Sequence, residues 1–139
     1  MKKKQIAQVF ALWEKYKAVK FRIGTSFPDF QAFAIVTAYN PKSILYSEKT
    51  NQLRQQKLCR YLEKSQLKYR RVVAGNTDFT YFEPSLAIET NIAQASNLAK
   101  LYGQNAIYFV IDENLFLLPI LVKYVEKENL GKFADFICE

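Results

Sequence analysis

Few side chains in this sequence could act as an acid, a base or a nucleophile. The chain contains no histidine, which excludes imidazole bases and zinc sites with histidine ligands. Cys59 lies close to the cations Lys57 and Arg60, which favour a reactive thiolate, but a helical cysteine without a histidine partner is usually a structural residue. The nucleophile-elbow, dinucleotide, P-loop and EF-hand motifs are missing. We therefore predict no catalytic residue, no metal site and no cofactor, and whether any reaction is catalysed stays open.

A candidate place for a binding site is the stretch FAIVTAYNPKS, residues 33–43. It begins as an apolar, β-branched strand and breaks at Asn40 and Pro41 into a polar turn. Buried core and exposed hydrogen-bonding groups therefore lie within a few residues of one another. If the chain has a site, we expect it to start here.

Charge is distributed unevenly along the chain. Residues 1–75 hold 16 Lys and Arg against 4 Asp and Glu, whereas residues 76–139 hold 4 against 9. The basic half is a candidate surface for an anionic partner. Its candidate contacts, all on one predicted helix, are Lys49, Arg54, Lys57, Arg60 and Lys64. Two other interpretations are solvated helix faces that share a sign, or pairing of acidic and basic halves between subunits. Nucleic-acid binding would be non-specific, because no strand carries the aromatic pattern of an RNA-recognition sheet.

Hydrophobic periodicity predicts three main helices. Residues 6–16 repeat apolar side chains every three or four positions, with Trp13 in a buried stripe. A second helix follows the predicted N-cap Ser47. Its expected buried residues are Leu53, Leu58, Tyr61 and Leu62. A third helix spans residues 91–102 and ends at Gly103.

Apolar runs and alternating patterns predict six strands. These strands are 19–23, 32–39, 67–74, 83–89, 106–111 and 115–120. Residues 24–29, with Pro28, indicate a turn, and the C-terminal segment indicates a weak helix around 122–129. The fold class is therefore α+β, with a ferredoxin-like βαββαβ core, an added C-terminal hairpin strand, and an N-terminal helix and strand. We predict a single domain over residues 1–139.

The start of the chain does not resemble an export signal, because Gln5 and Gln8 interrupt the apolar residues that follow the first lysines. No window approaches the roughly 18 apolar residues that a membrane span needs. Cys59 and Cys138 lack the spacing of a metal or redox pair and are expected to be free thiols. We therefore expect a cytoplasmic protein that does not contact a membrane.

Three motifs stand in order along the chain: TAYNP at 37–41, EPS at 83–85 and YGQNAIYFV at 102–110, with Asn51 between the first two. Together they resemble a family of small bacterial proteins known only as a domain of unknown function. The resemblance covers about residues 31–118 and implies a bacterial origin, a small α+β domain and no established activity. It also singles out the polar positions Asn40, Glu83, Ser85, Gln104 and Asn105.

These five polar residues have two interpretations. Side chains of Asn, Glu and Gln at strand ends either recognise the amide or base edge of a ligand, or bond the backbone groups that are unpaired where strands stop. We favour the second interpretation. In the predicted sheet, Asn40, Gln104 and Asn105 should cluster, and Glu83 should lie at the opposite end. If Glu83 lies beside Asn40 instead, either the strand order is wrong or the three motifs form one pocket.

Three functions are consistent with the sequence. We prefer a non-enzymatic interaction module that binds a protein or an anionic partner through the basic half, because no catalytic constellation is visible. The first alternative is a small-molecule binding protein or enzyme with a polar site at Asn40, Glu83, Ser85 and Gln104, in which only Glu83 could act as acid or base. The second alternative is a structural homo-oligomer joined through an exposed strand edge.

Overall fold

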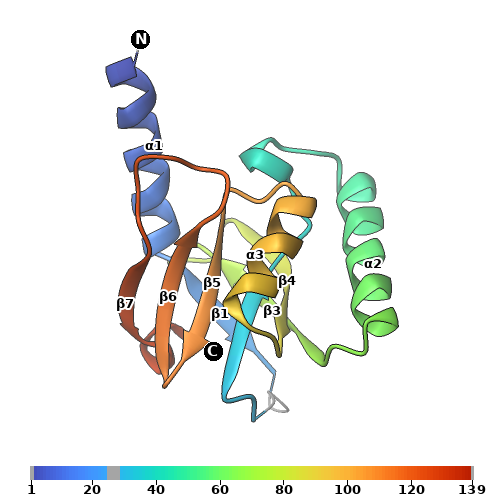
Figure 1. The fold of residues 1–139 in the computed structure, drawn as a ribbon. Helices are drawn as coiled ribbons and strands as arrows, with labels where there is room; N and C mark the ends of the chain where they lie inside the picture. The colour runs from blue at the N-terminus through green and yellow to red at the C-terminus, as the bar shows by residue number, and fades with distance from the viewer. Residues whose placement is uncertain (1, 25–28, 139) are drawn as a thin grey trace.

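The computed structural model describes residues 2–24 and 29–138, and Figure 1 shows its ribbon. The described helices are α1 (Lys2–Lys17), α2 (Glu48–Lys64) and α3 (Ile92–Leu101). The described strands are β1 (Lys20–Ile23), β2 (Ala32–Val36), β3 (Tyr69–Gly75), β4 (Phe82–Ile88), β5 (Ala106–Ile111), β6 (Asn114–Pro119) and β7 (Glu128–Lys132). Two short 3₁₀ helices are η1 (Pro41–Ser43) and η2 (Phe133–Phe136). The turn predicted over residues 24–29 lies mostly outside the described residues.

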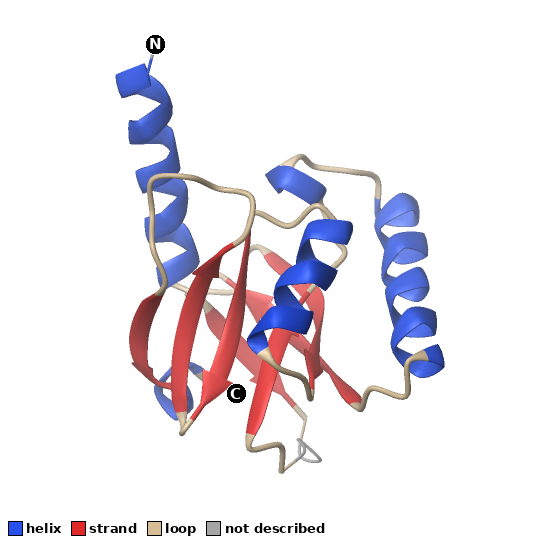
Figure 2. Cartoon of the chain, viewed as in Figure 1, coloured by secondary structure: helices blue, strands red, loops and turns tan. Residues whose placement is uncertain are grey.

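The described strands form one curled antiparallel sheet, a half-barrel, in the order β1-β3-β4-β2-β5-β6-β7. The predicted α+β class is confirmed, but the predicted ferredoxin-like core is wrong, because β4 runs antiparallel to β2 and that core needs these two central strands to be parallel. Figure 2 shows α2 and α3 together on one side of this sheet. Beyond β7, the C-terminal tail returns to β1, where Ile137 pairs with Phe21 and the Cys138 amide donates to the Phe21 carbonyl at 2.8 Å. The tail therefore leads from β7, at one edge of the curled sheet, to β1 at the other edge.

Two apolar clusters lie on opposite faces of the sheet, because side chains alternate along each strand. In β2, Ala34 and Val36 pack with the buried residues of α2 and α3. Phe33 and Ile35 point to the other, concave face. There the Phe33 ring lies 5.5 Å from the ring of Phe133, measured between centroids. This aromatic cluster fills the concave face around the start of β2, and leaves the end of β2 to other residues.

One of the helix predictions was wrong. The segment predicted to be helical around residues 122–129 contains the start of β7, which pairs with β6. An apolar strand such as β6 gains backbone partners on its outer edge from this pairing, which outweighs a weak helical pattern. The helix predicted over residues 6–16 is confirmed within α1, where the stripe residues Ile6, Val9 and Tyr16 are half-buried although the N-terminal part of α1 extends beyond the sheet (Figure 1). Trp13 is the one described residue of α1 that is buried, and Phe10 is 50% exposed.

None of the described helices combines the length and the apolarity that crossing a bilayer requires. The two cysteines, Cys59 and Cys138, are free, as predicted from their separation.

Candidate functional site

A cavity of about 540 Å³ lies on the concave face, where β2 ends and where β4 and β5 begin. We call it the concave cavity. Four of the five polar residues from the sequence motifs line it, and so do three tyrosines. The motif residues are Asn40, Glu83, Ser85 and Gln104, and the tyrosines are Tyr16, Tyr81 and Tyr108. Residues from three separate motifs therefore border one cavity.

The expected position of Glu83 was wrong. β4 runs antiparallel to β2, with Leu86 opposite Val36, so the first residues of β4 lie beside the end of β2. This direction brings Glu83 to Asn40, whereas the predicted ferredoxin-like core would have made the two strands parallel. Strand direction depends on how α2 and β3 connect the two strands in space, and local sequence patterns do not encode it.

Asn40, Tyr81 and Glu83 form a triangle of hydrogen bonds at the cavity. The amide nitrogen Nδ2 of Asn40 donates to Glu83 Oε2 at 2.8 Å and to the Tyr81 hydroxyl at 3.1 Å. The Tyr81 hydroxyl donates in turn to the same Glu83 oxygen at 2.6 Å. Both donors therefore use one carboxylate oxygen, and the geometry of the carboxylate is held from two sides.

The other half of the Asn40 side chain organises the loop that follows β2. Its Oδ1 accepts from the Tyr46 amide at 2.9 Å and from Asn51 Nδ2 at 2.8 Å, while the Asn40 amide donates to Asn51 Oδ1 at 2.9 Å. Asn40 has φ 47°, in the left-handed region that asparagine tolerates better than most residues. The next residue, Pro41, is buried and starts η1. Asn40 thus joins the strand end, the loop and α2.

The motif at residues 102–110 meets this loop directly. Lys42 donates its amide to the Gly103 carbonyl at 2.7 Å, and a Cβ on Gly103 would lie only 2.9 Å from Pro41 Cβ. Gln104 Nε2 donates to the carbonyls of Tyr39 and Tyr102 at 3.1 and 3.2 Å. Gln104 therefore bonds backbone groups where β2 has stopped.

Ser85 and Asn105 occupy different positions around the cavity. Ser85 lines it, and its hydroxyl donates to the Glu83 carbonyl at 3.2 Å. Asn105 does not line it, but its Nδ2 donates to the Ser43 hydroxyl at 3.0 Å, and Ser43 is a lining residue. Asn105 thus positions the wall of the cavity from outside.

The C-terminal end of α1 covers one side of the cavity. The Tyr108 hydroxyl, on β5, donates to the Tyr16 carbonyl at 2.7 Å, and the Tyr16 hydroxyl lies 2.9 Å from the Ser43 hydroxyl oxygen. Farther from the cavity, Trp13 Nε1 donates to Glu128 Oε1 at 3.2 Å. These bonds hold α1 against the sheet although most of its length is exposed.

Burial controls the electrostatics of the cavity. It raises the pKa of the Glu83 carboxyl above its usual range, although the hydrogen bonds from Tyr81 and Asn40 oppose this shift. Burial also raises the pKa of Tyr81, which donates to the Glu83 carboxylate, and that of Tyr108. The two phenols therefore stay protonated at neutral pH and act as donors.

Part of the polar network comes from α2, where the motifs included Asn51 but not Gln55. Gln55 Oε1 accepts from the Ala38 amide at 2.8 Å, and its Nε2 donates to the Pro84 carbonyl at 3.1 Å. Asn51 and Gln55 are buried, whereas Leu53 and Tyr61, expected in the core, are 55% and 46% exposed. The spacing of four between Asn51 and Gln55 and the buried Leu58 was the signal for this face. It went unused because a buried helix face is expected to be apolar.

The five basic residues proposed as contacts for an anionic partner do not behave alike. Arg54 is partly buried and donates from Nε to the Ala38 carbonyl and from Nη2 to the Tyr102 carbonyl, both at 2.7 Å. Arg54 therefore connects α2 to the loops around β2 and α3. The other four are exposed on α2, and none has an ion pair with a described residue. They are Lys49, Lys57, Arg60 and Lys64.

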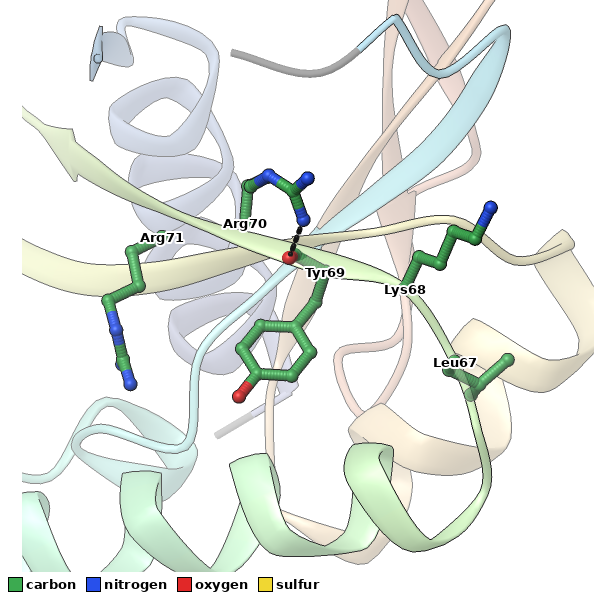
Figure 3. A pocket seen from close by; sticks show the side chains of 5 residues that line it. All are labelled: Leu67, Lys68, Tyr69, Arg70 and Arg71. Carbon is green, nitrogen blue, oxygen red and sulfur yellow. Dashed lines mark hydrogen bonds between the residues drawn. The ribbon is translucent and has the colours of Figure 1, made fainter. Parts of the chain in front are cut away.

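The basic run that follows α2 divides its charges between two directions. Figure 3 shows Leu67 to Arg71 around a shallow pocket, with Arg71 and Tyr69 directed toward α2 and Arg70 directed away from it. The Tyr69 hydroxyl donates to Glu63 Oε2 at 2.7 Å, and Arg71 Nη1 lies 3.8 Å from Cys59 Sγ. Arg70 donates to the Tyr69 carbonyl at 2.9 Å. These residues therefore do not extend the basic surface of α2 as one continuous patch.

No group of three or more Cys, Asp and Glu side chains that could hold a metal ion is found within residues 2–24 and 29–138. Glu83 is the one carboxylate among the residues that line the concave cavity, and its described partners are Asn40 and Tyr81. The lining is therefore suited to hydrogen bonding and to charge recognition.

Comparison with known proteins identifies a family for the chain. The model of the family described as "Protein of unknown function (DUF3293)" matches residues 36–107. The match contains all five motif residues and the whole of α2, whereas α1 lies outside it. No curated protein and no solved structure matches the chain. The match covers just over half of the chain and confirms the resemblance found in the three motifs, so the chain belongs to the DUF3293 family of proteins of unknown function.

Proposed function

We propose that this protein binds a small molecule in the concave cavity. The observation that carries the proposal is the convergence of Asn40, Glu83 and Gln104, from three separate motifs, on one cavity of about 540 Å³. Cavities of roughly 300–1,000 Å³ with apolar walls and a few polar groups are typical of ligand sites. The apolar part of this wall includes Val19, Ile35, Ala74 and Ala106.

Glu83 favours a ligand site over a purely structural network. Asn40 and Gln104 bond backbone groups of the loop and of β2, as the favoured interpretation of the sequence expected. The Glu83 carboxylate has no such task, because both of its described hydrogen bonds come from side chains. A carboxylate taken out of water without a cation costs stability. A ligand that interacts with it would offset that cost, and we therefore rank ligand binding above the interaction module.

A thermal-shift screen against a metabolite library tests this proposal. A ligand present at 100 times its Kd stabilises the folded protein by about 2.7 kcal/mol, which raises Tm by several degrees. Ala106→Leu, which adds a branched side chain to the cavity wall, should abolish the shift. Ala93→Leu, on the exposed face of α3, is the matched control and should leave it unchanged. A library without a stabilising compound, or a shift that survives Ala106→Leu, would refute the proposal.

A second candidate function is binding of an anionic macromolecule by α2. Lys49, Lys57, Arg60 and Lys64 fall within a roughly 80° arc of the helix at about 100° per residue. They are exposed and lack ion pairs to described residues. Fluorescence anisotropy with oligonucleotides at low and physiological salt tests this candidate, since phosphate contacts weaken steeply with salt. Binding that Lys57→Glu and Arg60→Glu leave unchanged would exclude this surface.

We also infer that the chain forms a single domain. One continuous sheet in the order β1-β3-β4-β2-β5-β6-β7, with α2 and α3 packed on one face, supports this inference. The concave cavity lies on the face that the two helices leave open, where α1 and the C-terminal tail are added.

A further inference from the structure

The side chains inside the concave cavity leave hydrogen-bond acceptors free but few donors. This inference rests on the proposed function, because it concerns the ligand of the same cavity. Six of the lining residues already donate every side-chain N–H or O–H group that they have to a protein acceptor. They are Thr37, Asn40, Tyr81, Ser85, Gln104 and Tyr108. Of the other lining residues, Tyr16 and Ser43 share one hydrogen bond between their hydroxyls, and Asn76 Nδ2 donates to Thr80 Oγ1. Lys15 and Thr77 are exposed. The interior therefore has little to offer a ligand that needs donors.

Acceptors remain free in the same interior. Glu83 receives both of its hydrogen bonds on Oε2, and its Oε1 bonds no described residue. Gln104 donates twice through Nε2, while its Oε1 likewise bonds none of residues 2–24 and 29–138. No buried side-chain oxygen or nitrogen in this part of the chain lacks a partner, so both free oxygens have accessible surface. Both residues line the cavity, where a ligand donor can reach them.

The charged side chain inside the concave cavity is negative. Glu83 is the carboxylate of the lining, and no described lysine or arginine forms an ion pair with it. Lys15, on the exposed side of α1, lies at the rim where water screens its charge. A partly buried carboxylate without a protein cation is a site for a ligand cation, because charge-assisted hydrogen bonds are the strong ones. The apolar wall formed by residues such as Ile35 and Ala106 suits a hydrocarbon or aromatic body.

We propose that the ligand is a small organic cation, an amine or a guanidine joined to an apolar body, whose N–H groups donate to Glu83. Gln104 Oε1 supplies a second acceptor for the polar end of the ligand. The apolar body lies against Ile35 and Ala106, and the ring of Tyr108 forms part of the same wall. The triangle with Asn40 and Tyr81 holds the carboxylate in position before the ligand arrives, which reduces the ordering cost of binding.

Four probes with the same aromatic ring test the ligand class. The cations are 2-phenylethylamine and benzylguanidine, the neutral probe is 2-phenylethanol and the anion is phenylacetate. Binding to the full chain is measured by thermal shift and by isothermal titration calorimetry. We expect the cations to bind and the anion not to bind. Glu83→Gln should weaken cation binding by at least about tenfold, since it removes a partly buried counter-charge. Glu89→Gln, at the other end of β4 and outside the cavity, should leave binding unchanged.

The outcomes separate the ligand class from the proposed function. Glu83→Gln keeps an oxygen that can accept from Asn40 and Tyr81, and its circular dichroism spectrum and Tm verify the fold. Phenylacetate or 2-phenylethanol binding as tightly as the cations, or Glu83→Gln binding like the unmodified protein, overturns the ligand class. If no cation binds but the metabolite screen finds a ligand that Ala106→Leu blocks, the ligand class fails and the binding function stands. If neither experiment finds a ligand, both proposals fail.

Discussion

The Asn40 side chain makes four hydrogen bonds that join the end of β2 to the loop, to α2 and to β4. Asn40→Ala removes all four and leaves an alanine with φ near 47°. Asn40 is 8% exposed and Asn51 is 3% exposed, so water cannot easily replace the bond between them. We therefore expect Asn40→Ala to be strongly destabilising.

The magnitude follows from the partners. The bonds to Tyr46 and Tyr81 contribute less, because these residues are 42% and 49% exposed and water partly replaces the bonds. The bonds to Asn51 and Glu83 contribute about 1 to 1.5 kcal/mol each, because these partners are withdrawn from water. Alanine in the left-handed region costs a further amount of about 1 kcal/mol. The sum predicts a loss of about 3 kcal/mol in the free energy of unfolding, a large share of the roughly 5 to 15 kcal/mol of a typical domain.

Urea denaturation followed by Trp13 fluorescence and circular dichroism measures this loss. Asn40→Gly removes the same hydrogen bonds but accepts the positive φ, so it should lose about 1 kcal/mol less than Asn40→Ala. Asn97→Ala, on an exposed position of α3, is the control and should change stability by about 0.5 kcal/mol at most. An unchanged denaturation midpoint for Asn40→Ala would refute the reasoning, and equal losses for the alanine and glycine variants would refute the part assigned to backbone strain.

Three further predictions concern stability. Burial raises the pKa of Glu83 in the folded state, so its ionisation lowers stability as pH rises from the unfolded value, about 4.3, through the folded pKa. Urea titrations across this interval measure the free energy of unfolding of Glu83→Gln and of the unmodified protein. The value for Glu83→Gln minus the value for the unmodified protein should increase with pH. A difference independent of pH would contradict the assignment. Arg54→Ala, which removes two bonds to backbone carbonyls, should cost about 1.5 to 3 kcal/mol by the same method. Lys57→Ala should cost almost nothing, and equal effects of the two variants would show that Arg54 is not structural. Gly103→Ala should lower Tm more than Gly131→Ala, because both have positive φ but only Gly103 would place a Cβ 2.9 Å from a proline side chain. Similar Tm values for these two variants would argue against that close contact.

The sequence was sufficient for the elements whose signals are local. Side chains alternate along β2, so Phe33 and Ile35 on one face and Ala34 and Val36 on the other follow from the spacing of residues. Ser47 caps α2 by accepting from the Thr50 amide, as its type and position predicted. The motif residues were also recognisable as a group, because the family match contains them.

The local sequence pattern does not determine which residues of α2 are buried. A periodic pattern predicts that a helix has a buried face, but the sheet determines which residues that face contains. Leu53 was expected in the core and is exposed, whereas Gln55 is buried because the Ala38 amide and the Pro84 carbonyl need partners at the ends of their strands. The requirement for those partners exists only after the strands have been brought together.

The sequence by itself determined the α+β class, most element positions and the set of polar residues, because propensity and periodicity act over a few neighbouring residues. The tertiary structure alone decided that these residues share a cavity. Asn40 and Glu83 are 43 positions apart, and Gln104 and Tyr39 are 65 apart. Their contacts depend on the antiparallel direction of β4 and on the curl of the sheet. Both arise from the packing of the whole chain, in which backbone pairing and core burial over long separations outweigh any local preference.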